Sequence, residues 1–242
     1  NVILLSMTPA DCDVALRNMD IRPGQFVQVK TPDNATFLRR PISICFIDGK
    51  ANKLSLLVRD AGNGSHAIMH SPVGSKLNII LPLGNGFSTI KSGSSPLLIG
   101  GGVGVAPLLM LGAYLKQTGI NPTFLIGAKT RDAILLANEL SQYGHTCIST
   151  DDGSFGEKGL VTQNHILEKE FSSIYCCGPL PMMKAVAKIA KQKDIFCEVS
   201  LENVMGCGIG ACLCCVEKTV KGNLCVCKDG PVFNINQLLW HN

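Results

Sequence analysis

Short segments in which apolar and polar residues alternate predict β-strands in the first part of the chain. The alternation is clear over residues 26–30 and 54–58, and a further strand is predicted over residues 76–80, after a Pro-Val-Gly turn. Glycine, proline and asparagine separate these segments, which is typical of short antiparallel strands. We therefore expect residues 1–90 to form a small β-barrel or sandwich domain.

The pattern then changes to apolar runs that alternate with helix-like stretches. The runs cover residues 97–100, 123–127, 146–150, 174–177 and 196–199. The clearest helices are predicted over residues 106–117 and 182–193. Strands that alternate with helices are typical of a parallel sheet. The polar residues 91–96 predict a domain boundary, so this second domain is expected to span residues 91–200.

The last part of the chain has little periodicity and is rich in cysteine and glycine. We expect residues 201–242 to form a separate small lobe. Because apolar periodicity is weak here, something other than a hydrophobic core is predicted to hold this lobe together. Six of the 12 cysteines lie between Cys207 and Cys227.

Composition narrows the class of protein. The chain has 242 residues, of which 46% are hydrophobic and 17% charged, below the usual charged share of about 25%. This excludes a disordered chain. A net charge of +4 and 5% aromatic residues argue against nucleic-acid binding. The long uncharged run between Lys91 and Lys116 is interrupted by glycines and Pro107, so we expect no membrane span. No export signal is visible, which predicts a cytoplasmic location.

A glycine-rich segment at residues 100–107 is a candidate phosphate-binding loop. It reads Gly-Gly-Gly-Val-Gly-Val-Ala-Pro, follows an apolar strand and opens a helix. Free amides at a helix start attract anions, and glycines let a phosphate approach the backbone. The alternative is a tight strand–helix turn. Further small-residue turns at 150–154 and 177–179 follow other strands of the same sheet, where ligands bind, so a nucleotide site is predicted.

The choice of nucleotide depends on the turn at residues 150–154. An acidic side chain there could accept a hydrogen bond from a ribose hydroxyl and disfavour a 2′-phosphate, which favours NAD over NADP. The alternative is that Asp151 and Asp152 only stabilise a solvated turn.

Two segments of the first domain are candidate anion sites. Arg40 begins an Arg-Pro-Ile-Ser sequence, and its guanidinium could pair with a diphosphate while Ser43 hydrogen-bonds a flavin ring edge. Arg59 ends a predicted strand, and residues 62–65 (Gly-Asn-Gly-Ser) open a possible helix. The alternatives are an edge strand that starts at Pro41 and an ordinary surface arginine.

The cysteine spacing predicts an iron–sulfur site. Cys207, Cys212 and Cys215 give C-x4-C-x2-C, the spacing of plant-type 2Fe–2S proteins. Glycines between them leave room for the inorganic core, and backbone amides can donate to sulfur. The fourth ligand is Cys225 or Cys227. The competing interpretation is a zinc site made by Cys212, Cys215, Cys225 and Cys227.

The order of these motifs resembles the ferredoxin–NADP reductase superfamily, and within it the electron-transfer subunits of type B (NAD-dependent) dihydroorotate dehydrogenase. The resemblance covers nearly the whole chain. Its most specific parts are Cys-Gly-Ile-Gly-Ala-Cys at 207–212 and Val-Cys-Lys-Asp-Gly-Pro-Val-Phe at 226–233. It implies an antiparallel FAD-binding β-barrel, a parallel-sheet NAD-binding domain and a small C-terminal 2Fe–2S lobe, in a mixed β and α/β fold.

The resemblance also implies the residues of each site. FAD is expected along Arg40, Pro41, Ile42, Ser43, Leu57, Val58, Arg59, Gly64 and Ser65. NAD is expected on Gly102, Gly104, Val105, Cys177, Gly178 and Pro179. Cys207, Cys212, Cys215 and Cys227 would ligate the cluster. Many members of the superfamily have an aromatic residue where this chain has Ile42, which puts flavin stacking at that position in doubt.

In this family the dihydroorotate site and its FMN belong to another polypeptide. The resemblance therefore implies an NAD-linked oxidoreductase subunit in a heterotetramer with the FMN-containing catalytic subunit of dihydroorotate dehydrogenase. Electrons would pass from that FMN through the cluster and FAD to NAD⁺ as orotate forms in pyrimidine biosynthesis. The alternatives are a reductase subunit of a related hydrogenase or ferredoxin–NADP transhydrogenase complex, and a zinc-stabilised nucleotide sensor without turnover.

Overall fold

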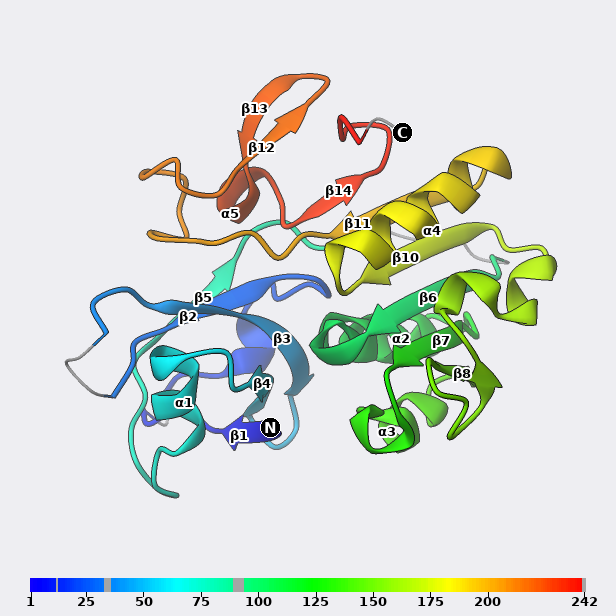
Figure 1. Cartoon of the computed structure of the whole chain (residues 1–242). Coiled ribbons are helices and arrows are strands. Elements are labelled where there is room, and N and C mark those ends of the chain that lie inside the picture. Colours follow the sequence, from blue (N-terminus) through cyan, green and yellow to red (C-terminus); the bar gives the residue numbers. More distant parts are fainter. Residues whose placement is uncertain (12, 33–35, 89–93, 241–242) are drawn as a thin grey trace.

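The computed structural model describes residues 1–11, 13–32, 36–88 and 94–240. They form an antiparallel sheet, a larger mostly parallel sheet and a small C-terminal hairpin (Figure 1). The mixed β and α/β fold predicted from the sequence is confirmed. Cys12 and residues 89–93, which include part of the predicted boundary at 91–96, lie outside the described residues.

The antiparallel sheet contains the N-terminal strands. Its order is β1-β4-β3-β2-β5. The strands are β1 (Val2–Met7), β2 (Phe26–Val29), β3 (Arg40–Asp48), β4 (Lys53–Arg59) and β5 (Ile79–Leu83), and the short helix α1 (Asn63–Met69) follows β4. Val27 and Val29 point into one core with the apolar residues of β4, as the alternation predicted.

The position of one strand differs from the prediction. The expected strand over residues 76–80 begins only at Ile79 and continues to Leu83. Pairing with β2 starts where Ile79 meets Val29, and Lys76 before it is exposed. The Pro-Val-Gly turn before residues 76–80 predicted a strand there, but the start of β5 depends on where its partner β2 ends.

The larger sheet has the order β14-β11-β10-β6-β7-β8-β9. Its strands are β6 (Pro96–Gly101), β7 (Thr123–Ala128), β8 (His145–Thr150), β9 (Glu157–Lys158), β10 (Ser173–Cys177), β11 (Phe196–Ser200) and β14 (Val232–Asn234). All neighbours run parallel except β14, which is antiparallel to β11. The parallel sheet predicted from the alternating pattern is confirmed.

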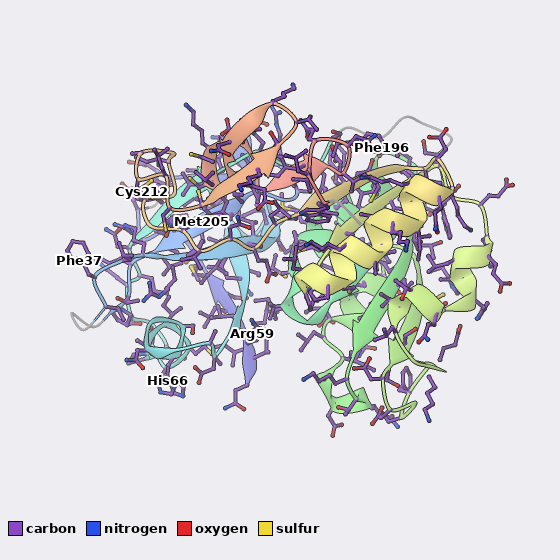
Figure 2. All side chains as sticks on the ribbon, turned by 45° about the horizontal axis from the view of Figure 1, so that its top comes forward. Phe37, Arg59, His66, Phe196, Met205 and Cys212 are labelled. Atoms are coloured by element: carbon purple, nitrogen blue, oxygen red, sulfur yellow. The ribbon has the colours of Figure 1, made fainter. Side chains whose placement is uncertain are left out.

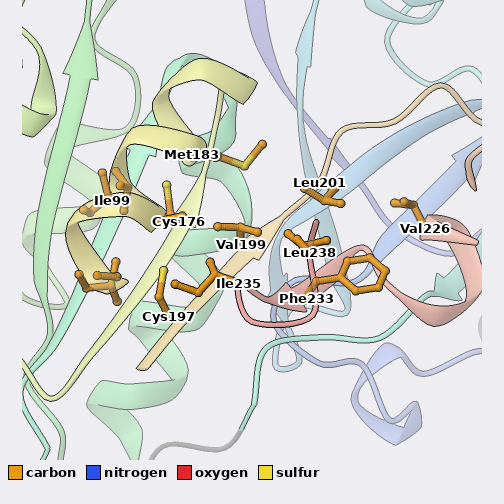
Figure 3. Close-up of a cluster of buried hydrophobic side chains, with 14 of the residues drawn as sticks. Ile99, Cys176, Met183, Cys197, Val199, Leu201, Val226, Phe233, Ile235 and Leu238 are labelled. Carbon is orange, nitrogen blue, oxygen red and sulfur yellow. The ribbon is translucent and has the colours of Figure 1, made fainter. Parts of the chain in front are cut away.

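Helices cover both faces of this sheet. They are α2 (Val105–Gln117), α3 (Ala137–Ser141) and α4 (Leu180–Gln192). Leu97 and Ile99 of β6 pack with residues of α4, whereas Leu98 between them packs with α2. Because successive side chains of a strand point to opposite faces, the uninterrupted apolar run of β6 is buried on both sides. Figure 3 shows part of the core on the α4 side.

The remaining elements are short. The C-terminal part contains β12 (Val216–Thr219), β13 (Gly222–Cys225) and the single turn α5 (Val226–Asp229). Turns of 3₁₀-helix lie at Leu16–Asn18, Gly102–Gly104, Arg131–Ala133, Val161–Gln163 and His165–Glu168.

The C-terminal part is held differently from the expectation. Met205, Cys215, Val226 and Phe233 belong to the same buried cluster as the residues of α4 (Figure 3). The prediction that this lobe lacks a hydrophobic core is therefore wrong. Its apolar residues join a core shared with the parallel sheet and α4, and they come from short elements, so no period is visible in the sequence.

Contacts across the junction join the two larger sheets. Helix α2 packs against β3, and Cys45 of β3 is buried among its leucines. Ser88 donates its backbone N–H to the carboxylate of Glu198 at 2.9 Å, and its hydroxyl donates to the same carboxylate. Glu198 is itself buried in β11. These contacts fix the antiparallel sheet against the parallel one.

Most of the described cysteines outside the C-terminal segment are core residues, whereas Cys147 is partly exposed. Cys45, Cys176, Cys177 and Cys197 are buried and free. Burial raises the pKa of both Cys45 and Cys197 to about 12, so these thiols stay protonated and unreactive near neutral pH. In the described part of the chain, no helix is both long and apolar enough to span a bilayer.

Gly112 provides a test of the packing of α2. A glycine inside a helix costs about 1 kcal/mol relative to alanine, so its presence needs a packing reason. A Cβ at this position would lie 2.3 Å from Cζ of Phe124, whose ring is buried. We expect Gly112→Ala to lower the free energy of unfolding by about 1–3 kcal/mol through overpacking.

Thermal or denaturant unfolding of the purified chain measures this effect. Gln117→Ala on the exposed end of the same helix is the matched control and should change stability by less than about 0.5 kcal/mol. A Gly112→Ala variant more stable than the parent would show that helix propensity outweighs the predicted clash.

Candidate functional site

A cleft of about 550 Å³ lies where the antiparallel sheet meets the C-terminal segment. Three stretches of chain line most of it: the start of β3, the end of β4 with the start of α1, and the connection over residues 201–205. All the residues expected to hold FAD line this cleft, namely Arg40, Pro41, Ile42, Ser43, Leu57, Val58, Arg59, Gly64 and Ser65. Residues separated in the sequence thus share one cavity.

Strand direction explains why two arginines meet here. β3 and β4 are antiparallel, so Arg40 at the start of β3 and Arg59 at the end of β4 lie at the same end of this strand pair. The Arg40 guanidinium donates to the carbonyl oxygen of Leu38 at 3.1 Å, and it lies against Gly64, where a Cβ would be 2.1 Å from its Nε. This end of the strand pair carries two guanidinium groups, whose positive charge suits a diphosphate.

The far wall of the cleft contains residues for which the sequence predicted no role. Glu202, Asn203, Val204 and Met205 follow β11 and line the cavity. Although Glu202 is partly solvent-accessible, burial of its carboxyl group raises its pKa, and the charge of Arg59 acts in the opposite direction. Their position just after a parallel strand is the signal that could have identified them.

The glycine loop and the Cys-Gly-Pro turn lie side by side. β6 and β10 are neighbours in the sheet, so the turns after them meet. A Cβ on Gly104 would be 2.4 Å from the carbonyl oxygen of Cys177 and 2.6 Å from the backbone nitrogen of Gly178. Only glycine permits this contact, so the two turns that carry the residues predicted for NAD pack directly against each other, and Gly104 and Cys177 are buried where they meet.

The turn at residues 150–154 lies elsewhere along the same edge. β7 separates its strand, β8, from β6. The carboxylate of Asp152 accepts hydrogen bonds from the backbone N–H of Ser154 at 2.9 Å and from its hydroxyl at 2.6 Å. These bonds lower the pKa of Asp152. Its interactions therefore stabilise the turn, in line with the alternative interpretation of this acidic pair.

The clustered cysteines form two pairs linked by backbone amides. In the first pair, the Cys207 thiol sulfur accepts the N–H of Cys212 at 3.4 Å, and the Cys212 sulfur accepts the N–H of Cys207 at 3.4 Å. In the second, the Cys215 sulfur accepts the N–H of Cys227 at 3.3 Å. The amide of Gly210 joins the pairs, because it donates to the Cys227 sulfur at 3.1 Å.

This arrangement fits a binuclear cluster. Each iron of a Cys₄ 2Fe–2S cluster takes two thiolates, and these four cysteines supply two pairs of sulfurs. The N–H groups of Ile209 and Ala211 donate to the Cys207 sulfur at 3.4 and 3.2 Å. Hydrogen bonds from the Ile209 and Cys212 amides lower the pKa of Cys207 to about 6. Among the described residues, no three His, Cys, Asp or Glu side chains are grouped as ligands of a single metal ion.

The two candidates for the fourth ligand differ in environment. Burial, and then the neighbouring Cys215 thiol, raise the pKa of Cys227 to about 12, and its sulfur faces the loop through Gly210. The Cys225 sulfur makes a long contact of 4.0 Å to the carbonyl oxygen of Gly210, and burial, followed by the nearby Cys215 thiol, raises its pKa. The backbone N–H of Cys225 donates to Asp229 at 2.7 Å, which fixes the start of α5.

The irregular segment of residues 207–215, here called the thiol loop, is adjacent to the cleft. Met205 lines the cleft and packs in the same buried cluster as Cys215 and Cys227. Figure 2 shows Met205 and Cys212 on one stretch of chain beside the strands of the antiparallel sheet. A group bound by the thiols and a group bound in the cleft would therefore be close neighbours.

Two family models match the chain. One, described as the iron–sulfur cluster binding domain of dihydroorotate dehydrogenase B, matches residues 202–239. The other, described as an oxidoreductase NAD-binding domain, matches residues 98–188. The first contains the paired thiols, and the second contains the glycine loop and the Cys-Gly-Pro turn.

Curated relatives match over most of their length. A dihydroorotate dehydrogenase B (NAD(+)) electron transfer subunit from Lysinibacillus sphaericus is 42% identical over 224 residues, which is 88% of this chain and 86% of the relative. The subunit of the same name from Clostridium perfringens is 40% identical over 215 residues, covering 88% and 85%.

Solved structures share the fold. The structure of an NADH-dependent reduced ferredoxin-NADP oxidoreductase, described in work on flavin-based electron bifurcation, superposes with a TM-score of 0.86 at 28% identity. It covers 99% of this chain and 85% of that one. The FAD/NAD-binding domain of a nitric oxide dioxygenase from Vibrio cholerae gives a TM-score of 0.69 at 21% identity, covering 80% and 88%.

Proposed function

Because the chain belongs to the family of dihydroorotate dehydrogenase B electron transfer subunits, we propose that it carries electrons from a dihydroorotate-oxidising partner to NAD⁺. The reaction would yield orotate for pyrimidine biosynthesis. The cofactors of this chain are FAD, a 2Fe–2S cluster and NAD. The observation that carries the proposal is the pairing of four amide-bound thiols beside a cleft with an arginine-lined edge.

We assign the cofactors to the residues predicted for them. FAD lies in the cleft, with Arg40 and Arg59 next to its diphosphate and the amides of residues 62–65 at the start of α1. NAD lies on residues 102–105 and 177–179, where the turns after β6 and β10 pack closely together. The cluster is ligated by Cys207, Cys212, Cys215 and Cys227. The division into units 1–90, 91–200 and 201–242 follows this assignment.

The chemistry is that of the cofactors, and the chain positions them. A bound flavin exchanges single electrons with an iron–sulfur cluster and a hydride with nicotinamide. Leu57 and Val58 are buried residues that line the cleft and keep water from the ring. Backbone amides of the thiol loop compensate the negative charge of the thiolates. No catalytic acid or base is required of this chain.

The name 'electron transfer subunit' carried by the relatives implies a catalytic partner subunit. We propose that it holds FMN and that two copies of each chain form a heterotetramer. A cytoplasmic location fits an enzyme of pyrimidine synthesis. No nucleic-acid or membrane partner is expected.

The alternative functions have less support. A reductase subunit of a hydrogenase or transhydrogenase complex would share this fold, and the ferredoxin-NADP oxidoreductase structure illustrates the likeness. The curated relatives at about 40% identity are instead named as dihydroorotate dehydrogenase B subunits. A zinc-stabilised sensor is not supported, because the matching C-terminal model describes iron–sulfur binding.

Assembly with an FMN-containing dihydroorotate dehydrogenase tests the proposed function. The complex should reduce NAD⁺ when dihydroorotate is added, and NADH alone should bleach the flavin absorbance of the isolated chain. A colourless chain that contains zinc, or a complex that reduces only artificial dyes with dihydroorotate, would contradict the proposal.

Serine substitutions separate the two candidates for the fourth cluster ligand. Because the Cys227 sulfur faces the thiol loop, we expect Cys227→Ser to lose most of the bound iron and sulfide and the visible absorbance of the cluster. Cys225→Ser is the matched control and should keep at least most of the iron. Loss of the cluster in Cys225→Ser with retention in Cys227→Ser would reverse the assignment.

The contact between the glycine loop and β10 predicts an effect on NADH binding. Gly104→Ala would force the loop away from the Cys177 carbonyl oxygen, since the new Cβ would lie 2.4 Å from it. We expect NADH affinity to fall at least about tenfold, roughly 1.4 kcal/mol, as measured by calorimetric titration of the holo-protein.

Gly119→Asn is the control for that variant. Gly119 has a positive φ of 81° and open space around it, and asparagine tolerates this conformation. Unchanged NADH affinity in Gly104→Ala would move the nucleotide site away from this loop.

A further inference from the structure

Gln28 of β2 is a buried polar side chain whose amide is unsatisfied. Its residue is 0% exposed, and neither its Nε2 nor its Oε1 has a hydrogen-bond partner. Buried amides are normally paired, since leaving one unpaired costs free energy. A glutamine in the middle of a strand that otherwise reads Phe, Val and Val therefore calls for a partner absent from the polypeptide.

The surroundings of Gln28 point to the thiol loop. Val27 and Val29 face the core of the antiparallel sheet, so Gln28 faces the opposite side, like Phe26. Gly208 lies directly against it: a Cβ there would be 2.7 Å from Cγ and Nε2 of Gln28. Gly208 has a φ of +77° and lies between two of the proposed cluster ligands, Cys207 and Cys212.

The cleft is a less suitable place for this amide. Phe26 and Pro41, which surround Gln28 in the sheet, line the cleft, but Gln28 does not. The loop already directs several backbone N–H groups toward thiol sulfurs. A side-chain N–H beneath Gly208 adds a donor from a different element, on the side of the loop that faces β2.

We propose that Nε2 of Gln28 donates a hydrogen bond to a sulfur of the cluster and so raises its reduction potential. The inference rests on the proposed function, because it requires that the loop holds a 2Fe–2S cluster. Reduction adds one electron and makes the sulfurs more negative, so a donor stabilises the reduced form more than the oxidised form. Gln28 is a positioning and tuning residue, and β2 thereby contacts both the cleft, through Phe26, and the cluster.

Gln28→Met removes the donor while nearly preserving side-chain length and flexibility. The test uses the holo-protein with FAD and cluster bound, titrated with dithionite and followed by electron paramagnetic resonance for the cluster and by absorbance for the flavin. We expect the equilibrium constant for cluster reduction to fall roughly tenfold, about 59 mV for one electron, with the flavin potential unchanged.

Controls keep the result interpretable. Gln28→Leu provides a second donor-free variant, and Gln142→Leu removes an exposed glutamine and should leave both potentials unchanged. Iron content must match the parent for each variant. Selective ¹⁵N labelling of glutamine side chains should also give a nitrogen coupling to the reduced cluster in pulsed resonance spectra that disappears in Gln28→Met.

Each other outcome overturns the inference. A shifted flavin potential with an unchanged cluster potential would assign the amide to the flavin. Reduced thermal stability with both potentials unchanged would show a packing role only. Either result leaves the proposed function intact, whereas a parent protein that holds zinc and no iron–sulfur cluster contradicts the proposed function itself.

Discussion

Four thiolates can lie close together in a protein only if their negative charge is compensated. Here the compensation comes from backbone N–H groups, which converge on the sulfurs of Cys207, Cys212, Cys215 and Cys227. The loop must fold back on itself to direct so many amides inward, which requires glycine at positions such as Gly208. This requirement explains why residues 201–215 form no helix or strand and why they rest on other elements for support.

The support comes from both larger sheets. Gln28 lies beneath the loop on the antiparallel sheet, and the side-chain amide of Asn85, after β5, donates to the carbonyl oxygens of Lys228 and Asp229 at 3.0 and 3.1 Å. On the other side, β14 pairs with β11. The cleft lies between these supports, so the same contacts that hold the thiol loop also define one wall of the cleft.

The sequence predicts features that depend on local pattern. Alternation located β2 and β4, apolar runs located the parallel strands, and the C-x4-C-x2-C spacing located the thiol loop. Features that depend on distant partners were missed: the start of β5 at Ile79 is set by pairing with β2, and the three residues of β14 are too few to show a period. The environment of Gln28 is of the same kind, because Gly208 is far from it along the chain.

The attachment of β14 to β11 protects one edge of the parallel sheet. A strand at the edge of a sheet exposes unpaired backbone groups and can recruit strands of other molecules. β14 covers the edge of β11, and it follows α5, which carries Cys227, after Gly230 and Pro231. Val232 and Phe233 of β14 are buried, so packing as well as backbone pairing holds this strand over an edge that would otherwise be open to strands of other molecules.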